Sequence, residues 1–265
     1  MMDKMILGRY VPAESILHRM DPRSKLIIIF LFVCIVFLAN NVLTYGILLA
    51  YTLCMISLSK IPIRFILNGL IPVLWLIGFT LIIHLLFTRE GELLVNLGWF
   101  KIYEEGLRQG IFISLRFFLL ILVTSLLTLT TTPIEITDGI EYLLAPLKKV
   151  KFPVHELALM MSISLRFIPT LMQETDIIMK AQTARGVDFS GGPIKDRLKA
   201  IIPLLIPLFI SSFKRAEELA VAMEARGYRG GEGRTKYRQL SWGFLDSAMI
   251  LFLVAVTVLL IIFRT

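Results

Sequence analysis

The segments Gln182–Asp188 (QTARGVD) and Met223–Arg229 (MEARGYR) contain the same tripeptide, Ala-Arg-Gly, and their arginines lie 41 positions apart. Each tripeptide follows an amphipathic stretch and ends in glycine, which readily adopts the left-handed conformation that terminates a helix. The sequence therefore predicts two long helices, each with an arginine at its tip beside the negative end of the helix dipole. A single arginine before a capping glycine is ordinary helix chemistry, whereas the repetition favours a docking function for the pair.

The residues before each tripeptide repeat with the period of an amphipathic helix. Before the first tripeptide, Arg166, Gln173 and Lys180 fall on the side opposite the apolar positions. Before the second, charged residues such as Lys214 and Glu217 likewise face away from the apolar stripe. The first stripe consists of Leu157, Met161, Leu165, Ile168, Met172 and Met179, and the second of Phe213, Ala216, Ala220 and Met223.

The composition is that of a membrane protein rather than a soluble globule. Hydrophobic residues make up 56% of the chain and charged residues only 18%, and the mean hydropathy is +0.77. A net charge of +8 could indicate nucleic-acid binding, but its distribution fits membrane topology, so no nucleic-acid partner is predicted. Cys34 and Cys54 lie inside apolar runs and are interpreted as small buried hydrophobic residues. No cleavable signal peptide is expected, because the first apolar run begins only at Leu26.

Five apolar runs predict an all-α integral membrane protein of about five transmembrane helices with a cytoplasmic region of long amphipathic helices. The runs are residues 26–39, 42–58, 70–87, 111–130 and 244–263. Asn40-Asn41 makes the turn of a tight hairpin between the first two runs, and 88–109 is interpreted as a polar loop. The expected divisions are an N-terminal segment (1–25), a four-span region (26–130), a coupling-helix region with both tripeptides (131–243) and a C-terminal transmembrane helix (244–265).

The positive charges orient this arrangement. Residues 1–25 carry five Lys and Arg and residues 131–243 carry sixteen, whereas the loop 88–110 carries three against four acidic residues. Because cytoplasmic segments are enriched in Lys and Arg, the N-terminus and the coupling region are predicted to be cytoplasmic. Five spans then place the C-terminus outside the cell, in a multi-pass protein of the plasma membrane.

Two stretches, 157–172 and 201–213, are apolar enough to be taken for further spans. As a transmembrane hairpin they would place Lys180, Arg185 and Lys195 outside, against the charge trend. The second stretch is also short and contains Pro203 and Pro207. Both are therefore interpreted as helices at or under the membrane surface, with partial embedding left open.

The sequence contains no motif for catalysis. It lacks a phosphate-binding G-x-x-x-x-G-K-[ST] loop and any cluster of Cys or His, so neither a cofactor nor a metal site is predicted. His84 lies at membrane depth, where a structural hydrogen bond is favoured over a functional role. Arg116 lies near one end of the fourth span and is long enough to reach the interface. Asp246 begins the last span, with Arg238 as its expected partner.

Several motifs together resemble one known family. Leu165–Pro169 (LRFIP) leads into the first tripeptide, while Pro203, Pro207 and Lys214–Ala220 (KRAEELA) lead into the second. Asp21–Lys25 (DPRSK) enters the first apolar run. Over essentially its whole length, the chain resembles the transmembrane coupling (T) component of energy-coupling factor transporters.

This resemblance implies a non-catalytic subunit of an ABC-type importer of vitamins or a transition-metal ion. In that family the T component joins a small substrate-binding membrane protein to two cytoplasmic ATPases, and the tips of its crossing coupling helices dock on the ATPases. The residues that follow the glycines differ, Val187-Asp188 against Tyr228-Arg229, which suits a heterodimer of ATPases. The implied docking residues are Ala184, Arg185, Gly186, Ala225, Arg226 and Gly227.

Two other classes of protein are possible alternatives. A stand-alone multi-pass secondary transporter would have inverted repeats of spans and polar groups at mid-membrane, but here the repeat lies outside the predicted spans. A membrane enzyme would have clustered ionisable or metal-ligating residues near the interface. Co-purification separates the three alternatives, since only the coupling subunit should retain two nucleotide-binding proteins and a small membrane protein.

Overall fold

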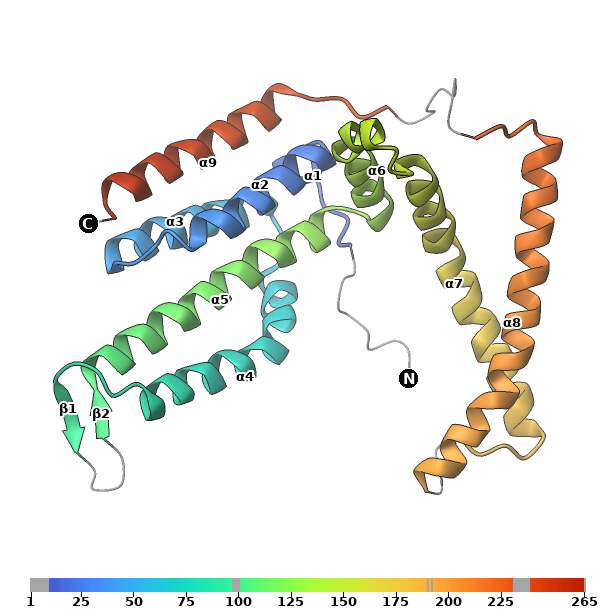
Figure 1. Cartoon of the computed structure of the whole chain (residues 1–265), viewed down its shortest axis with the longest axis horizontal. Coiled ribbons are helices and arrows are strands. Elements are labelled where there is room, and N and C mark those ends of the chain that lie inside the picture. The colour runs from blue at the N-terminus through green and yellow to red at the C-terminus, as the bar shows by residue number, and fades with distance from the viewer. Residues whose placement is uncertain (1–9, 97–100, 190, 192, 231–238, 265) are drawn as a thin grey trace. The chain divides into compact units, whose positions relative to one another are not determined.

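The computed structural model describes residues 10–264 except 97–100, 190, 192 and 231–238. Helices dominate the described chain (Figure 1), which confirms the all-α prediction. The helices are α1 (Ile16–Arg19), α2 (Pro22–Val36), α3 (Val42–Ser59), α4 (Ile63–Phe87), α5 (Glu104–Thr130), α6 (Pro133–Leu143), a 3-10 helix (Ala145–Val150), α7 (Val154–Ala184), α8 (Ile194–Ala225) and α9 (Phe244–Ile262). The antiparallel strands β1 (Leu93–Asn96) and β2 (Lys101–Tyr103) precede α5.

The chain forms two compact units. The bundle unit comprises Met1–Leu143 and Arg238–Thr265, and the two-helix unit comprises Leu144–Tyr237. Helix α6 packs on α2 and thus belongs to the bundle unit, although charge density placed its residues in the coupling region. The two-helix unit contains both Ala-Arg-Gly tripeptides.

The core of the bundle unit lies among α2, α3, α5 and α9. Phe32, Leu48, Leu119 and Leu253, one from each helix, are fully buried. Phe32 also stacks on Tyr51, with ring centroids 5.6 Å apart. Apolar contacts between helices distant in sequence therefore hold this unit together, because the side chains exclude both lipid and water from the core.

Two glycines allow α5 to pack closely on α4. Gly106 and Gly110 lie four residues apart on α5, and both are buried. A Cβ atom at Gly106 would lie 3.0 Å from the carbonyl oxygen of His84, and one at Gly110 would lie 3.3 Å from the Cβ of His84. Small residues at this spacing let membrane helices approach each other closely.

The prediction of a polar loop at 88–109 is partly wrong. This segment contains the paired strands β1 and β2, and α5 already begins at Glu104.

Among the residues that the structure describes, four helices are long and apolar enough to cross a membrane: α3, α5, α7 and α9. A fifth candidate is α4, where Ile63–Ile71 and Val73–Phe87 meet at an angle of 54°. The multi-pass prediction is confirmed, but the set of helices differs from the predicted one. Helix α2 has only 15 residues, about 22 Å of helix, while α7 qualifies as the least apolar of the four.

The interpretation of the cysteines as buried is wrong. Cys34 and Cys54 are both exposed in the described chain. Cys34 lies two residues from the buried Phe32 and Val36, and a shift of two positions turns a side chain by about 200° around a helix. It therefore points away from the core and into the apolar outer surface of the bundle unit.

Candidate docking site

The two Ala-Arg-Gly tripeptides end α7 and α8 with the same backbone geometry. Arg185 has φ −86° and ψ 5°, and Arg226 has φ −86° and ψ 7°. Gly186 and Gly227 follow with φ +90° and +74°, the left-handed region in which glycine is favoured. The prediction that glycine terminates each helix is confirmed at both positions.

The same pair of hydrogen bonds closes each helix. At the end of α7, the Gly186 N–H donates to the carbonyl of Thr183 (2.9 Å) and the Val187 N–H to that of Gln182 (3.0 Å). The equivalent bonds after α8, from the amides of residues 227 and 228, are 2.8 and 3.0 Å long. This is the Schellman motif, which satisfies the last carbonyl groups of a helix. Local sequence alone therefore fixes both tips.

All six predicted docking residues are exposed, namely Ala184, Arg185, Gly186, Ala225, Arg226 and Gly227. Each tip presents a guanidinium group with alanine before it and glycine after it, so no bulky neighbour shields the charge. An added Cβ on either glycine would meet no atom within 4 Å. The two tips thus have the accessibility that a docking residue needs.

Helices α7 and α8 form an antiparallel pair held by polar contacts. Gln182 Nε2 near the end of α7 donates to the carbonyl of Pro203 near the start of α8 (3.3 Å). This carbonyl is free because Pro207, four residues later, has no N–H. Farther along, Glu174 accepts a hydrogen bond from Ser211 and pairs with Arg215 at 3.1 Å.

The antiparallel pairing separates the two tips. Helix α8 starts beside the tip of α7 and carries its own tip to the other end of the pair (Figure 1). It has 32 residues, about 48 Å if straight, although it changes direction along its length. The structure therefore brings the docking residues together within each tripeptide but does not join the two tripeptides into one site.

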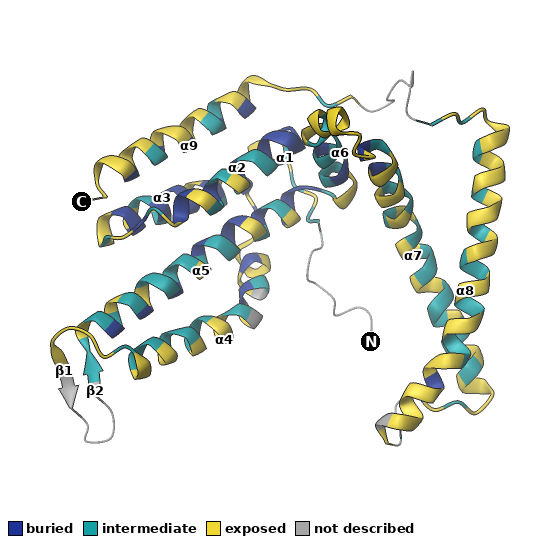
Figure 2. Ribbon diagram, viewed as in Figure 1, coloured by how far each residue is buried: buried dark blue, intermediate teal, exposed yellow. Residues whose placement is uncertain are grey.

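On α7 the apolar face that contacts α8 is not the predicted stripe, whereas Ala216, Ala220 and Met223 of the predicted stripe on α8 do line the cavity between the two helices. Ile163, Phe167 and Leu171 line a cavity of about 320 Å³ between α7 and α8. Stripe residues such as Met161 and Ile168 are instead 42% and 48% exposed, and exposed positions run along both helices in Figure 2. Helix α7 thus has two apolar faces, and this unit covers only one of them.

A larger groove adjoins the second tip. Its volume is about 650 Å³, and it extends from α7 to the residues that follow α8. Three arginines line it, Arg166 from α7 and Arg226 and Arg229 from the second tip. Sequence reasoning missed this grouping, because Arg166 and Arg226 are 60 positions apart and only the antiparallel pairing brings them to one groove.

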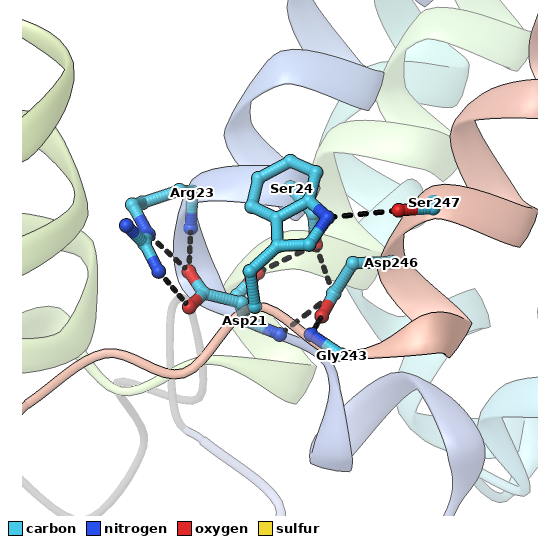
Figure 3. Close-up of polar contacts among 7 residues, drawn as sticks. Asp21, Arg23, Ser24, Gly243, Asp246 and Ser247 are labelled. Carbon is cyan, nitrogen blue, oxygen red and sulfur yellow. Dashed lines mark hydrogen bonds and ion pairs between the residues drawn. The ribbon is translucent and has the colours of Figure 1, made fainter.

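A buried polar cluster joins the start of α2 to the start of α9 (Figure 3). The Asp246 carboxylate accepts hydrogen bonds from the Asp21 N–H (2.9 Å), the Ser24 hydroxyl (2.5 Å) and the Gly243 N–H (2.7 Å). Structural pairing of Asp246 is therefore confirmed with other partners, while the expected partner, Arg238, lies outside the described residues.

The motif at 21–25 supplies most of this cluster. Asp21 binds the guanidinium of Arg23 through two hydrogen bonds of 2.9 and 2.7 Å, which raise the pKa of Arg23 above its usual range. Lys25 donates to the Thr130 carbonyl and the Thr131 hydroxyl at 3.1 Å. Burial lowers the pKa of Lys25 to about 8. Arg23 and Lys25 both lie just before the apolar run that begins at residue 26. The cluster therefore holds the N-terminal ends of α2 and α9 together.

The remaining ionisable candidates have structural contacts. His84 Nδ1 lies 3.4 Å from the Thr88 hydroxyl, and Arg116 reaches the turn after α2, where it donates to the Ala39 carbonyl at 3.4 Å. Within the described ranges, no three His, Cys, Asp or Glu side chains are grouped as metal ligands would be. The two helix tips are the candidate site because their backbone geometry matches and all six of their predicted docking residues are exposed.

Comparisons with known proteins show which proteins this chain is similar to. Residues 13–237 match the family described as cobalt transport protein, CbiQ. The relative from Bacillus subtilis (strain 168), named energy-coupling factor transporter transmembrane protein EcfT, is 66% identical over 264 residues, 100% of both chains. Proteins of the same name from Exiguobacterium sibiricum and Listeria innocua are 62% and 57% identical; the matches cover 98% and 100% of this chain, and 99% and 100% of the relatives.

Proposed function

The chain belongs to the family of transmembrane components of energy-coupling factor transporters, and on this premise we propose that it couples two cytoplasmic ATPases to a small substrate-binding membrane protein. It is a multi-pass membrane protein whose family is non-catalytic. In the proposed complex, the partner subunits hydrolyse ATP and the chain transmits their movement for uptake of the substrate.

The observation that carries this proposal is the pair of matching tips. Two ATPases of similar fold offer two similar grooves, so one polypeptide needs two similar projections to bind both. The caps of α7 and α8 provide them, with backbone angles at Arg185 and Arg226 that agree within 2°. A guanidinium group suits such an interface because its planar fork donates to several acceptors at once.

The exposed apolar stripe supports a second role for α7. Four of its six residues, Leu157, Met161, Ile168 and Met172, are exposed, and a contiguous exposed apolar face is expected to be buried in the working protein. We assign it to the membrane surface and the substrate-binding subunit. Methionines such as Met160, Met161 and Met172 suit a surface that repacks against different partners.

The distribution of positive charge supports a cytoplasmic location for both tips. Helix α7 is apolar enough to span a membrane, but its last third carries Glu174, Asp176 and Lys180. Placing α7 under the membrane keeps these charges in water and keeps the positively charged coupling region inside. We therefore propose five spans, α2 with the rest of the apolar run 26–39, α3, α4, α5 and α9, which place the N-terminus in the cytoplasm and the C-terminus outside.

The substrate is assigned only by class. We propose a vitamin or a transition-metal ion, chosen by the separate binding subunit.

The test of the proposed function is recovery of the ATPases on the affinity-tagged chain after co-expression. Arg185→Ala and Arg226→Ala should each weaken binding by at least about thirtyfold, because loss of one partner of a buried interfacial charge pair costs about 2–5 kcal/mol. The double variant should lose both ATPases and transport. Lys180→Ala is the matched control, since it removes another exposed cation from α7.

Two results would contradict the proposal. One is a double variant that retains both ATPases and full transport. The other is labelling of a cysteine at position 185 by an impermeant reagent applied outside intact cells, because that would place the tip on the wrong side of the membrane.

A further inference from the structure

The two tips differ in charge, although their backbones match. The groove beside the second tip contains Arg166, Arg226 and Arg229, and no acidic residue lines it. Arg166, Arg226 and Arg229 form no ion pair with another described residue. The second tip therefore presents three positive charges on one concave surface.

The internal duplication shows what the first tip has instead. A shift of 41 positions, which relates Arg226 to Arg185, relates Arg229 to Asp188 and Arg166 to Pro207. At these equated positions the first tip thus has one positive and one negative charge, whereas the second has three positive charges. The acidic residue of the second segment, Glu224, does not line the groove. The Asp188 carboxylate accepts a hydrogen bond from the Gly191 N–H at 3.0 Å, so it is held in the turn after α7.

The corresponding face of α8 is apolar. The α7 residues of the groove, Leu159, Ser162, Ile163, Arg166 and Phe167, correspond by the same shift to Ala200, Pro203, Leu204, Pro207 and Leu208. This part of α8 does lie beside the tip of α7, because Gln182 binds the Pro203 carbonyl. Residues of both helices therefore contribute to the difference in charge between the two tips.

We propose that Arg166 and Arg229 make the second tip selective for an acidic groove on one of the two ATPases, and so determine which ATPase binds at which tip. This inference rests on the proposed docking function. Three guanidinium groups complement several carboxylates, whereas the first tip, with Arg185 and Asp188, gains much less from the same surface. Complementary charges discriminate between partners because like charges placed together cost several kcal/mol.

The geometry favours protein carboxylates over lipid headgroups as the occupant. Arg166 and Arg229 line one hollow with Arg226, the predicted docking residue, so one partner that binds Arg226 can reach all three. Phe167 and Leu219 line the same groove and add apolar contact for a protein side chain.

The experiment uses the full chain co-expressed with its two ATPases, each carrying a different tag. Arg226→Ala first identifies the ATPase bound at the second tip. Arg166→Ala/Arg229→Ala should weaken binding of that same ATPase about tenfold at roughly 0.15 M salt and leave the other unchanged. The difference from the unmodified chain should shrink near 1 M salt, because the Debye length falls from about 8 to about 3 Å.

The matched control is Lys180→Ala/Lys214→Ala, which removes two exposed cations that do not line the groove. Melting curves of the purified variants check that α7 and α8 remain folded. Equal retention of both ATPases by Arg166→Ala/Arg229→Ala at every salt concentration would overturn the inference. If that variant retains both ATPases but loses stabilisation by added phosphatidylglycerol, the groove serves lipid headgroups and the inference is likewise wrong.

The outcomes separate this inference from the function on which it rests. If Arg226→Ala releases an ATPase but Arg166→Ala/Arg229→Ala does not, docking stands and charge selection fails. If Arg185→Ala/Arg226→Ala releases neither ATPase, the docking function itself fails.

Discussion

Replacement of the capping glycines by alanine tests whether the shape of each tip matters as well as its charge. Gly186 and Gly227 have φ of +90° and +74°, and an alanine in this region costs about 1–2 kcal/mol. No atom lies within 4 Å of the added Cβ, so the cost comes from the backbone and not from a clash. Part of it is offset, since alanine restricts the unfolded chain by about 0.4–1 kcal/mol.

This strain weakens binding because it lowers the fraction of molecules in which the cap is closed. If the cap must be closed to dock, 1–2 kcal/mol reduces the apparent affinity for an ATPase by up to about 5–30-fold. The assay is titration of the detergent-solubilised chain with the purified ATPases. Gly186→Ala should weaken one ATPase and Gly227→Ala the other.

Asparagine provides the control for this prediction, because it tolerates the left-handed conformation. Gly186→Asn and Gly227→Asn should bind more tightly than the alanine variants although their side chains are larger. Alanine variants with unchanged affinity would refute the claim that the cap positions the arginine. Asparagine variants as weak as alanine would show that the partner requires the absence of a side chain.

Three further predictions concern the packing of the helices. Asp246→Ala removes the acceptor of three hydrogen bonds and should destabilise the chain by about 3 kcal/mol, measured by thermal melting in detergent with the exposed Ser247→Ala as the control. Gly106→Ala places a Cβ atom 3.0 Å from a backbone oxygen of α4 and should cost about 1–3 kcal/mol, whereas Gly78→Ala, with no atom within 4 Å, should not. Glu174→Gln loses the ion pair to α8 and should loosen the α7–α8 pair by about 1 kcal/mol, seen as faster amide exchange at the crossing.

The sequence predicted the features that depend on local residues. Each cap needs only the residues from 182 to 187, or from 223 to 228, because all of its hydrogen bonds lie within five positions. The last span was likewise predicted within one residue of its end, since 244–263 is continuously apolar and α9 covers Phe244–Ile262.

Features that depend on distant residues were not predicted. The Asp21 N–H and the Asp246 carboxylate are 225 positions apart. The sequence around each residue gives no indication that the other is its hydrogen-bond partner. The same holds for Arg166 and the second tip. On α7 the periodicity showed an apolar stripe, but it could not say which of two apolar faces packs on α8, because Ile163 and Phe167 are as hydrophobic as the stripe residues.

The division between local and distant contacts also bears on how the subunit works. Each tip is closed by hydrogen bonds within its own last turn, whereas Gln182, Glu174 and their partners on α8 provide the polar contacts of the crossing. A change in the angle between α7 and α8 would alter the polar contacts between the two helices and leave the hydrogen bonds within each tip intact. In the proposed complex, each arginine would therefore keep its orientation on an ATPase while the helices move relative to one another, as transmission of motion between subunits requires.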